Sequence, residues 1–541
     1  GSAAGVWNTD ACIASGEASG DRAVQALGRS TATARPPLKG GWITPIQPLY
    51  EVRVPDRKLK SFVDPQHDVT ADDVRLAHRE GYVSVEHLKR YTTLGMGTDQ
   101  GRTGNVVGLA ILAGQLGADI GQVGTTTFRP PFVPVTMGTI AGPEIGHHFQ
   151  PVRRSAMHGW HEAAGAAFVP AGLWLRPQYY ARPGEGLWDA IYRETVAVRT
   201  SVGLCDVSTL GKIDIQGADA AEFLNRVYIN AWSKLGIGRC RYGVMLREDG
   251  IVLDDGTTSR LADNHYLMTT TTASAGPVMG HLEYFLQVVW PELDVHIISV
   301  TEEWAAIALA GPDSRKVLER LTDDIDVSNE ALPFMGVRQG TFAGVAGRLF
   351  RISFSGELAY EINVPADYGQ HLWEAMLAAG KEFDITPYGT EALGILRTEK
   401  GHVVGGELNG RTTADDLGFG RMASSAKEFI GKRSLNRPGL TDENRKQLVG
   451  LVPADGKTAI PRGGQIVADP DHPLPKPMIG EVTSACYSPN LKTPIGLAII
   501  TAGRARLGET LYALSPMRGE RVAVTIADPV FIDPEGERLR A

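Results

Sequence analysis

Residues 239–255 are Arg-Cys-Arg-Tyr-Gly-Val-Met-Leu-Arg-Glu-Asp-Gly-Ile-Val-Leu-Asp-Asp, and they predict a β-hairpin. Asp-Gly between two apolar runs is a strong signal for a hairpin turn. The second strand is expected to end at Asp254 and Asp255, whose side chains strand geometry sends to opposite faces. One carboxylate should therefore face inward and need a cationic, hydrogen-bonding or ligand partner. The alternative is that both lie in water at the end of the strand.

Further motifs flank the hairpin along the chain. They are Val202–Lys212, Ile213–Gly217, Ala308–Pro312, Ile352–Glu361, Leu396–Gly401, Phe429–Lys432 and Ile479–Ser484. In this order and spacing they resemble the aminomethyltransferase, or T protein, of the glycine cleavage system, a family that binds tetrahydrofolate. The resemblance covers residues 171–531, and it depends on the whole series because no single motif in it is decisive.

A reduced pterin makes chemical demands that this chain can meet. The donor edge of the ring needs a carboxylate that accepts two parallel hydrogen bonds, and the ring faces need aromatic or apolar walls. The amines N5 and N10 need an acid that holds or relays a proton, and the glutamate tail needs a cation. Candidates for these roles are Asp254, Phe354, Glu357, Tyr360, Glu361 and Arg397.

The resemblance to the T protein assigns roles residue by residue. It implies that Asp254 is the catalytic aspartate, with Asp255 as its structural neighbour. Phe354 stands where the family has a tyrosine, so that stacking is kept and a hydroxyl contact is lost. For Glu361 and Arg397 the alternative to folate binding is a buried ion pair in the core. The implied folate-binding side chains are Tyr242, Phe354, Glu361 and Arg397.

A second resemblance lies upstream. Asp68–Asp73, Glu80–Gly101 and Pro151–Arg154 are similar to the α subunit of heterotetrameric sarcosine oxidase. In that subunit a dinucleotide-binding domain and a small helical domain precede a T-protein-like domain. The resemblance implies a flavin-bearing β-type subunit and further small subunits as partners. Since no cysteine lies between Cys12 and Cys205, an iron–sulfur cluster is not expected.

Residues 64–117 have a helical pattern. Thr70 and Asp73 predict a capping box, and further helices are expected from Ser84 to about Gly95 and over Asn105–Gly114. A polar, basic loop in this module suits the phosphate of FMN at an interface with a partner subunit. The alternative is a solvated loop between helices. The loop residues concerned are Lys89, Arg90, Thr92, Thr93 and Gln100.

The first fifty residues resemble the last loop and helix of a flavin- or pyridine-nucleotide-disulfide oxidoreductase domain, followed by a proline-rich linker over Thr31–Tyr50. The GxGxxG strand–turn–helix that opens such a domain is missing, so the NAD- or FAD-binding domain is expected to be largely absent. An ordinary N-terminal helix and an engineered leader are the alternatives. Downstream, no metal is expected at the histidines, because no cysteine and no acid except Glu162 completes the set formed by His147, His148, His158 and His161.

Length and composition limit the remaining possibilities. A chain of 541 residues is too long for one core, so that roughly two to four domains are expected. A net charge of −8 gives no basic footprint for nucleic acid, and no Lys/Arg run indicates a membrane surface. The cysteines, Cys12, Cys205, Cys240 and Cys486, are scattered, which favours a reducing cytoplasm over a disulfide framework.

The predicted fold class is α+β. Residues 1–50 form a dinucleotide-domain remnant and linker, 51–150 a helical module, 151–435 the T-protein-like folate-binding domain, and 436–541 a small β-barrel. The predicted function is that of a subunit of a sarcosine-type N-methyl amine oxidoreductase, which captures the oxidised one-carbon unit as 5,10-methylenetetrahydrofolate. The alternatives are a stand-alone aminomethyltransferase and a non-catalytic scaffold. Against the first, Glu391–Gly394 stand where the T protein has Gly-Ala-Arg-Asp.

Overall fold

The computed structural model describes residues 6–30, 47–52, 54, 57, 59–130, 132–142 and 151–541. The chain divides into two compact units, residues 1–149 and 150–541, and each is described by itself. Most of the predicted linker, together with His147 and His148, falls outside the described residues.

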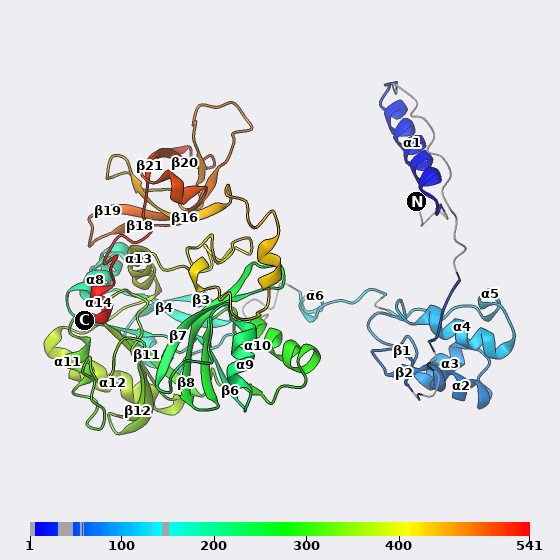
Figure 1. The fold of residues 1–541 in the computed structure, drawn as a ribbon, viewed down its shortest axis with the longest axis horizontal. Helices are drawn as coiled ribbons and strands as arrows, with labels where there is room; N and C mark the ends of the chain where they lie inside the picture. The colour runs from blue at the N-terminus through cyan, green and yellow to red at the C-terminus, as the bar shows by residue number, and fades with distance from the viewer. Residues whose placement is uncertain are drawn as a thin grey trace. The chain divides into compact units, whose positions relative to one another are not determined.

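The first unit is a small helical module, blue to cyan in Figure 1. The predicted capping box is present, because Thr70 Oγ1 accepts a hydrogen bond from Asp73 N and the Asp73 carboxylate accepts one from Thr70 N. Val74, Leu88 and Leu112 from three successive helices meet in its core. The elements are α1 (Thr9–Ala26), β1 (Phe62–Asp64), β2 (Val69–Thr70), α2 (Ala71–Arg79), α3 (Val85–Thr92), α4 (Asn105–Leu116), α5 (Ile120–Val123) and α6 (Met137–Ala141).

The second unit begins with a helix and a hairpin and continues into a five-stranded sheet in the order β10-β6-β9-β8-β7. Helices α9 and α10 cover one face of this sheet, where Phe223 and Leu282 pack against Met245. The other face carries Val244 and Leu246. The elements are α7 (His158–Ala163), β3 (Ala166–Ala171), β4 (Trp174–Tyr180), α8 (Leu187–Thr200), β6 (Gly211–Gln216), α9 (Ala220–Val227), β7 (Arg239–Leu246), β8 (Val252–Ala262), β9 (His265–Thr270), α10 (Ala275–Tyr284), the π-helix η3 (Phe285–Val289) and β10 (His296–Ser299).

The predicted hairpin is β7 and β8, with Gly250 in the left-handed conformation at the turn (φ 88°). Its second strand differs from the prediction, because it runs through Asp254 and Asp255 to Ala262 instead of ending there. The residues that follow the two acids include the β-branched Thr257 and Thr258, which favour continued extension. The two acids therefore lie within a strand and not at a solvated end.

A second sheet has six strands in the order β12-β13-β14-β11-β5-β15. Helices α11 and α12 cover one face, where Leu318 and Trp373 pack on Ile307 and Ile362. Helices α8 and α13 pack on the other face through Val198 and other residues. The elements are β5 (Gly203–Asp206), β11 (Trp304–Ala310), α11 (Ser314–Leu318), β12 (Val337–Phe342), β13 (Val345–Phe350), β14 (Ala359–Pro365), η4 (Ala366–Tyr368), α12 (Gly369–Ala379), η5 (Lys381–Phe383), β15 (Thr386–Pro387) and α13 (Thr390–Lys400).

The chain ends in a closed six-stranded barrel, orange to red in Figure 1, in which each strand pairs with its neighbours in the order β16-β19-β18-β17-β20-β21. This confirms the predicted C-terminal barrel, and the α+β body before it is confirmed as well. Short apolar strands with Gly and Pro turns close into a barrel because closure leaves no free edge. The elements are η6 (Gly420–Met422), η7 (Lys432–Asn436), β16 (Lys446–Pro453), β17 (Gln465–Val467), β18 (Gly480–Ser488), β19 (Thr493–Thr501), η8 (Gly503–Arg506), β20 (Thr510–Ser515), β21 (Glu520–Ala527) and α14 (Glu537–Arg540).

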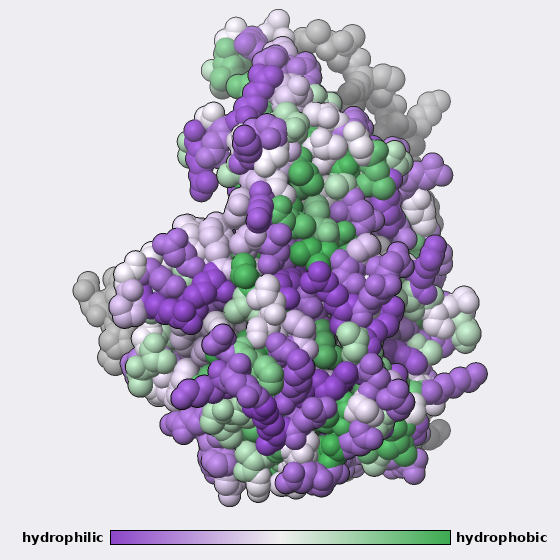
Figure 2. Space-filling model, turned by 90° about the vertical axis from the view of Figure 1, so that its left-hand side faces the viewer, coloured by the Kyte–Doolittle hydropathy of each residue, from purple (hydrophilic) through white to green (hydrophobic). Residues whose placement is uncertain are grey.

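The surface is mixed in character. On the face that Figure 2 shows, hydrophobic side chains form separate clusters within a largely hydrophilic surface. Scattered apolar residues are normal on a folded surface, so hydropathy alone does not mark a docking site on this face. Among the described residues, no helix combines the length and the apolar character needed to cross a membrane.

Candidate functional site

The hairpin holds its two acids on opposite faces. Asp255 lies opposite Val244 and accepts a hydrogen bond of 2.7 Å from the hydroxyl of Tyr242. Asp254 lies opposite Met245, on the face that the helices cover, and accepts hydrogen bonds from the amide and hydroxyl of Thr271 at 3.1 and 2.8 Å. Tyr242 thus contacts Asp255, whereas Asp254 binds Thr271 and so stabilises the turn that leads into α10.

Burial shifts both carboxyl groups towards their neutral forms. Desolvation raises the pKa of Asp255 to about 7, against the lowering effect of the Tyr242 hydrogen bond. Desolvation also raises the pKa of Asp254, although its bonds from Thr271 act in the opposite direction. Asp255 is half-buried and Asp254 fully buried. The more accessible acid therefore changes its charge near neutral pH, as a proton-transfer group requires.

Glu361 lies on β14, on the sheet face that α8 and α13 approach. It is half-buried, and no hydrogen bond from a described residue reaches its carboxylate. Desolvation raises its pKa to about 7, while the nearby cations Lys212 and Arg176 act to lower it. The Lys212 ammonium donates to the carbonyls of Ser208 and Leu210 at 2.8 and 3.0 Å, so it is held beside the carboxylate without bonding to it.

Arg397 on α13 is engaged elsewhere. Its guanidinium donates to the carboxylate of Glu407 at 3.2 Å and to the hydroxyl of Ser484 on the barrel at 2.5 Å. The alternative, a buried ion pair in the core, holds for Arg397, but the partner is Glu407 and not Glu361. The arginine therefore joins the body to the barrel. Among the other residues predicted to bind folate, Phe354 is linked to it through the backbone carbonyl of His402.

Phe354 lies near Arg397 through His402. The backbone carbonyl of Phe354 accepts a hydrogen bond of 2.9 Å from His402 Nδ1, and the two rings lie 5.6 Å apart. The carbonyl of His402 in turn accepts from Arg397 at 3.2 Å. Desolvation lowers the pKa of His402 to about 4, which keeps the imidazole neutral. Phe354 is 40% exposed, so that its ring face is free to stack on a ligand.

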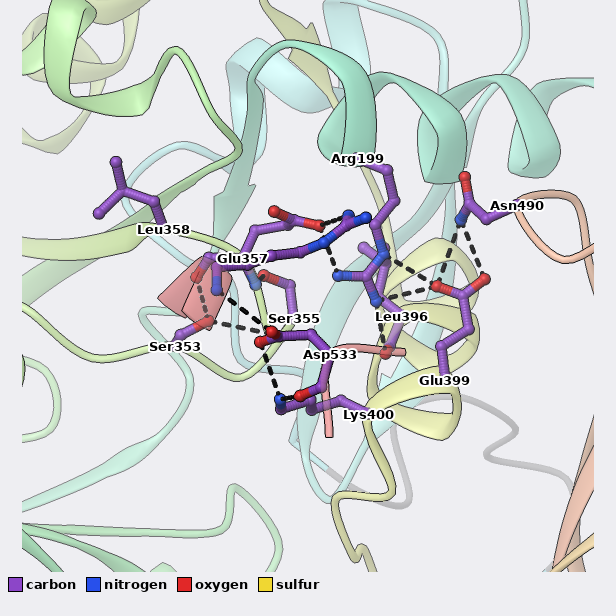
Figure 3. Close-up of polar contacts among 12 residues, drawn as sticks. Arg199, Ser353, Ser355, Glu357, Leu358, Leu396, Glu399, Lys400, Asn490 and Asp533 are labelled. Carbon is purple, nitrogen blue, oxygen red and sulfur yellow. Dashed lines mark hydrogen bonds and ion pairs between the residues drawn. The ribbon is translucent and has the colours of Figure 1, made fainter. Parts of the chain in front are cut away.

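A buried ion network holds the segments that carry these residues (Figure 3). Arg199 on α8 donates to Glu357 and Glu399, both at 2.9 Å, and to the carbonyl of Leu396 at 3.1 Å. Arg538 near the end of the chain donates to the same oxygen of Glu357 at 2.8 Å. The network thus fixes the loop before β14, which carries Phe354, against helix α13, which carries Arg397.

The barrel and the segment after it take part in this network. Ser488 donates to Glu399 at 2.5 Å. Asn490 donates to both oxygens of the same carboxylate, as Figure 3 shows. Lys400 pairs with Asp533, with 3.1 Å between the ammonium and the carboxylate. Each buried charge therefore has a partner, which offsets its desolvation.

Several of these residues carry no recognisable signal in the sequence. Lys212 stands at the end of the Val202–Lys212 motif, and Arg176, Arg199 and Glu407 lie outside all of the motifs. An isolated arginine in a sequence is usually an exposed residue, so only the tertiary structure shows which arginines are buried. The Ile352–Glu361 motif was the one usable signal, because it contains both Glu357 and Glu361.

Two clefts lie away from these residues. One of about 530 Å³ is lined by Arg226, Trp290, Phe429 and neighbouring residues. Another of about 350 Å³ is lined by residues that include Trp174 and Trp304. Neither is lined by a predicted folate-binding residue. The structure brings Tyr242 to Asp255 and links Phe354 to Arg397 through His402. It does not place Asp254, Glu361 and Arg397 in mutual contact.

In the first unit, the predicted flavin-interface residues differ in accessibility. Lys89 is buried, and its ammonium donates to the carbonyl of Thr127 at 2.5 Å. Arg90 is exposed, with Glu86 at 3.5 Å, and the Thr92 hydroxyl donates to the carbonyl of Leu88 one turn earlier in the same helix. The two remaining residues, Thr93 and Gln100, adopt the left-handed conformation with φ 66° and 56°. Lys89 stabilises the module, and the contact with flavin stays a prediction.

Two of the four clustered histidines, His158 and His161, lie within the described residues, and both are buried. His161 lies 3.1 Å from Asp206 through Nε2 and 2.9 Å from the hydroxyl of Tyr180 through Nδ1. His158 packs on Phe168 with 4.5 Å between ring centroids. Within the described ranges, no group of three or more His, Cys, Asp or Glu side chains is arranged to hold a metal ion.

Family models match most of the chain. The model described as the GCVT N-terminal domain matches residues 157–427, and the one described as the glycine cleavage T-protein C-terminal barrel domain matches residues 446–533. The chain belongs to the GCVT family. A third model, the sarcosine oxidase A3 domain, matches residues 58–143. This GCVT-family chain therefore combines a helical module with the two-part body that its sequence motifs predict.

Relatives of this GCVT-family chain are of two kinds. Sarcosine oxidase subunit alpha of Rhizobium meliloti is 48% identical over all of this chain, which spans 55% of that relative. The homologue of Corynebacterium sp. strain U-96 is 48% identical over 88% of the chain and 50% of its own length. The chain thus spans about half the length of these relatives. The predicted resemblance to this subunit is confirmed.

The second kind of relative is shorter. Aminomethyltransferase of Streptomyces coelicolor is 33% identical over 66% of this chain and 91% of its own length. Among solved structures, aminomethyltransferase T of Bartonella henselae, 23% identical, aligns with a TM-score of 0.61 over 71% of this chain and 99% of that one. This structural match shows the shared fold.

Proposed function

We propose that this chain belongs to a subunit of a multi-subunit, sarcosine-type N-methyl amine oxidoreductase. In this proposal the GCVT-family body binds tetrahydrofolate and captures the oxidised one-carbon unit as 5,10-methylenetetrahydrofolate. The high identity to sarcosine oxidase alpha subunits over the full chain supports the enzyme class. The single observation that carries folate binding is Glu361, a half-buried carboxylate that no described residue satisfies.

Glu361 has the properties of a ligand-binding acid. A buried carboxylate that serves only the fold is hydrogen-bonded by the fold, as Glu194 is by the amides of Tyr180 and Gly389 at 2.7 and 2.9 Å. Glu361 lacks such donors. The N3–H and 2-amino groups of a pterin would supply two parallel hydrogen bonds to it. Phe354 serves the stacking in this proposal. Arg397 would hold the glutamate tail only by exchanging its contacts with Glu407 and Ser484.

The proton-transfer group in this proposal lies on the hairpin. The resemblance to the T protein favours Asp254, whereas the contact with Tyr242 and the half-exposed position favour Asp255. Formation of the methylene bridge joins one carbon to N5 and N10 and releases water from formaldehyde or an amine from the imine. The amines must lose protons in this reaction, and a carboxylate with a pKa of about 7 can accept them.

Oxidation of the N-methyl group needs a flavin, and in this proposal FMN lies at an interface with a β-type subunit. The supporting features are the match to the sarcosine oxidase A3 domain and two exposed polar residues, Arg90 in the last turn of α3 and Thr93 directly after this helix. Further small subunits, a cytoplasmic location and the division at residues 50, 150 and 435 belong to the same proposal.

Calorimetric titration of the purified hetero-oligomer with tetrahydrofolate tests the proposal. Saturable binding by the wild type and its loss in Glu361→Ala are expected, while Glu194→Gln should retain binding if it folds. Production of methylenetetrahydrofolate from an N-methyl amine then tests capture, and comparison of Asp254→Asn with Asp255→Asn identifies the proton-transfer group. If no variant and no wild-type preparation bound folate, a scaffold role would be favoured instead.

A further inference from the structure

The sheet face around Glu361 consists mainly of small side chains. Cys205, Ala308 and Glu361 lie directly opposite one another on adjacent strands, so that they form one row on one face. With about 5 Å between paired strands, the row places the Cα atoms of Cys205 and Glu361 roughly 10 Å apart. Ala308 in the middle is half-buried among buried neighbours. The row therefore sets small side chains beside the Glu361 carboxylate.

Arg176 on β4 is the cation with a free donor near this row. One of its terminal nitrogens donates to the backbone carbonyl of Asp206, the residue after Cys205, at 3.4 Å. Its Nε is buried and has no hydrogen-bond partner in the described part of the chain. The guanidinium is close enough to Glu361 to lower the pKa of that carboxyl. Buried donors without a partner are rare in folded proteins, which indicates a missing acceptor.

Other groups near Arg176 are already satisfied. The Asp206 carboxylate accepts from Ser155, His161 and the amide of Ser208, so it does not claim the guanidinium. The Lys212 ammonium is held by two backbone carbonyls. An acceptor for the free donor of Arg176 would therefore come from outside the chain. It would lie beside the same row of side chains as the donors that bind the Glu361 carboxylate.

The geometry points to Arg176 as a specificity-determining residue that donates to the 4-oxo group of the pterin. This inference rests on the proposed folate function. In a 4-oxo pterin the O4 acceptor is adjacent to N3–H, which faces the carboxylate together with the 2-amino group. A carboxylate with a guanidinium in its vicinity thus matches the acceptor–donor–donor order of that edge. A 4-amino pterin presents a donor to Arg176 in place of the acceptor, and its N3 carries no proton to donate to the carboxylate, so both contacts disfavour it. The part due to Arg176 is the part that changes when Arg176 is replaced.

The test compares two ligands on the intact hetero-oligomer. Dissociation constants are measured for tetrahydrofolate and for 4-amino-4-deoxytetrahydrofolate with the wild type, Arg176→Met, Arg176→Lys and a surface control, Arg154→Met. Loss of a charge-assisted hydrogen bond changes an affinity by on the order of tenfold to a hundredfold. Arg176→Met should lower the affinity for the 4-oxo ligand by that factor and leave the 4-amino ligand unchanged or tighter. Arg154→Met should keep the wild-type ratio.

The outcomes separate this inference from the proposed function. If Arg176→Met bound both ligands with the wild-type ratio, Arg176 would not read the 4-position, although the folate site would stand. Absence of tetrahydrofolate binding in the wild type would overturn both. Should Arg176→Met fail to fold, Arg176→Lys must still shift the ratio. A wild type that does not distinguish the two ligands at all also refutes the inference.

Discussion

Replacement of Glu361 by glutamine should remove folate binding and make the protein more stable at alkaline pH. Desolvation raises the pKa of this carboxyl from 4.5 to about 7. Each pKa unit corresponds to 1.36 kcal/mol, so the ionised side chain costs about 3 kcal/mol of folding free energy at full effect. Because the group is half-buried, screening by solvent reduces this to roughly 2 kcal/mol.

The pH dependence of this effect has a definite sign. Between pH 4.5 and about 7 the folded protein holds a proton on Glu361 that the unfolded chain has released. The free energy of unfolding therefore falls as the pH rises through this window. Glutamine carries no such proton, so the difference between Glu361→Gln and the wild type should be small at pH 4.5 and reach its full value at pH 8.

Differential scanning calorimetry at pH 5 and pH 8 measures the effect. We expect the melting temperature of Glu361→Gln to exceed that of the wild type by a few degrees at pH 8 and by less at pH 5. Glu194→Gln is the matched control, since its carboxyl also has a pKa raised to about 7 but accepts two backbone hydrogen bonds. The control should be less stable than the wild type. A lower melting temperature for Glu361→Gln at pH 8 would refute the reasoning, because it would show that the carboxylate stabilises the fold.

Three further substitutions test the remaining structural arguments. Arg199→Met leaves two buried carboxylates without their shared partner, and calorimetry should show a loss of about 3–5 kcal/mol. Asp254→Ala removes the acceptor of two hydrogen bonds and should cost about 1–3 kcal/mol in urea unfolding. By contrast, Asp255→Asn should leave the fold intact and abolish the rise of folate turnover through pH 7, and an unchanged pH profile would exclude Asp255 as the proton acceptor.

The local elements followed from the sequence because short-range chemistry specifies them. The Asp249-Gly250 turn, the Thr70 capping box and the short strands of the barrel depend on residues close together in the chain, and all are present. The error in the second hairpin strand has the same origin. Two acids look like the end of a strand when their partners, Thr271 and Tyr242, are not known to lie beside them.

Sequence by itself determined the order of the parts, the GCVT-family motifs and the positions of the acids, since hydrophobic periodicity and turn residues act over a few positions. Only the tertiary structure decided which acid of the pair meets Tyr242 and that Arg397 pairs with Glu407. It also decided that Arg199 and Lys212 are buried charges and that the Nε of Arg176 is buried. The physical reason is that the energy of a charge depends on its burial and on partners far away in the chain, as for Arg199 and Glu399, which lie 200 positions apart.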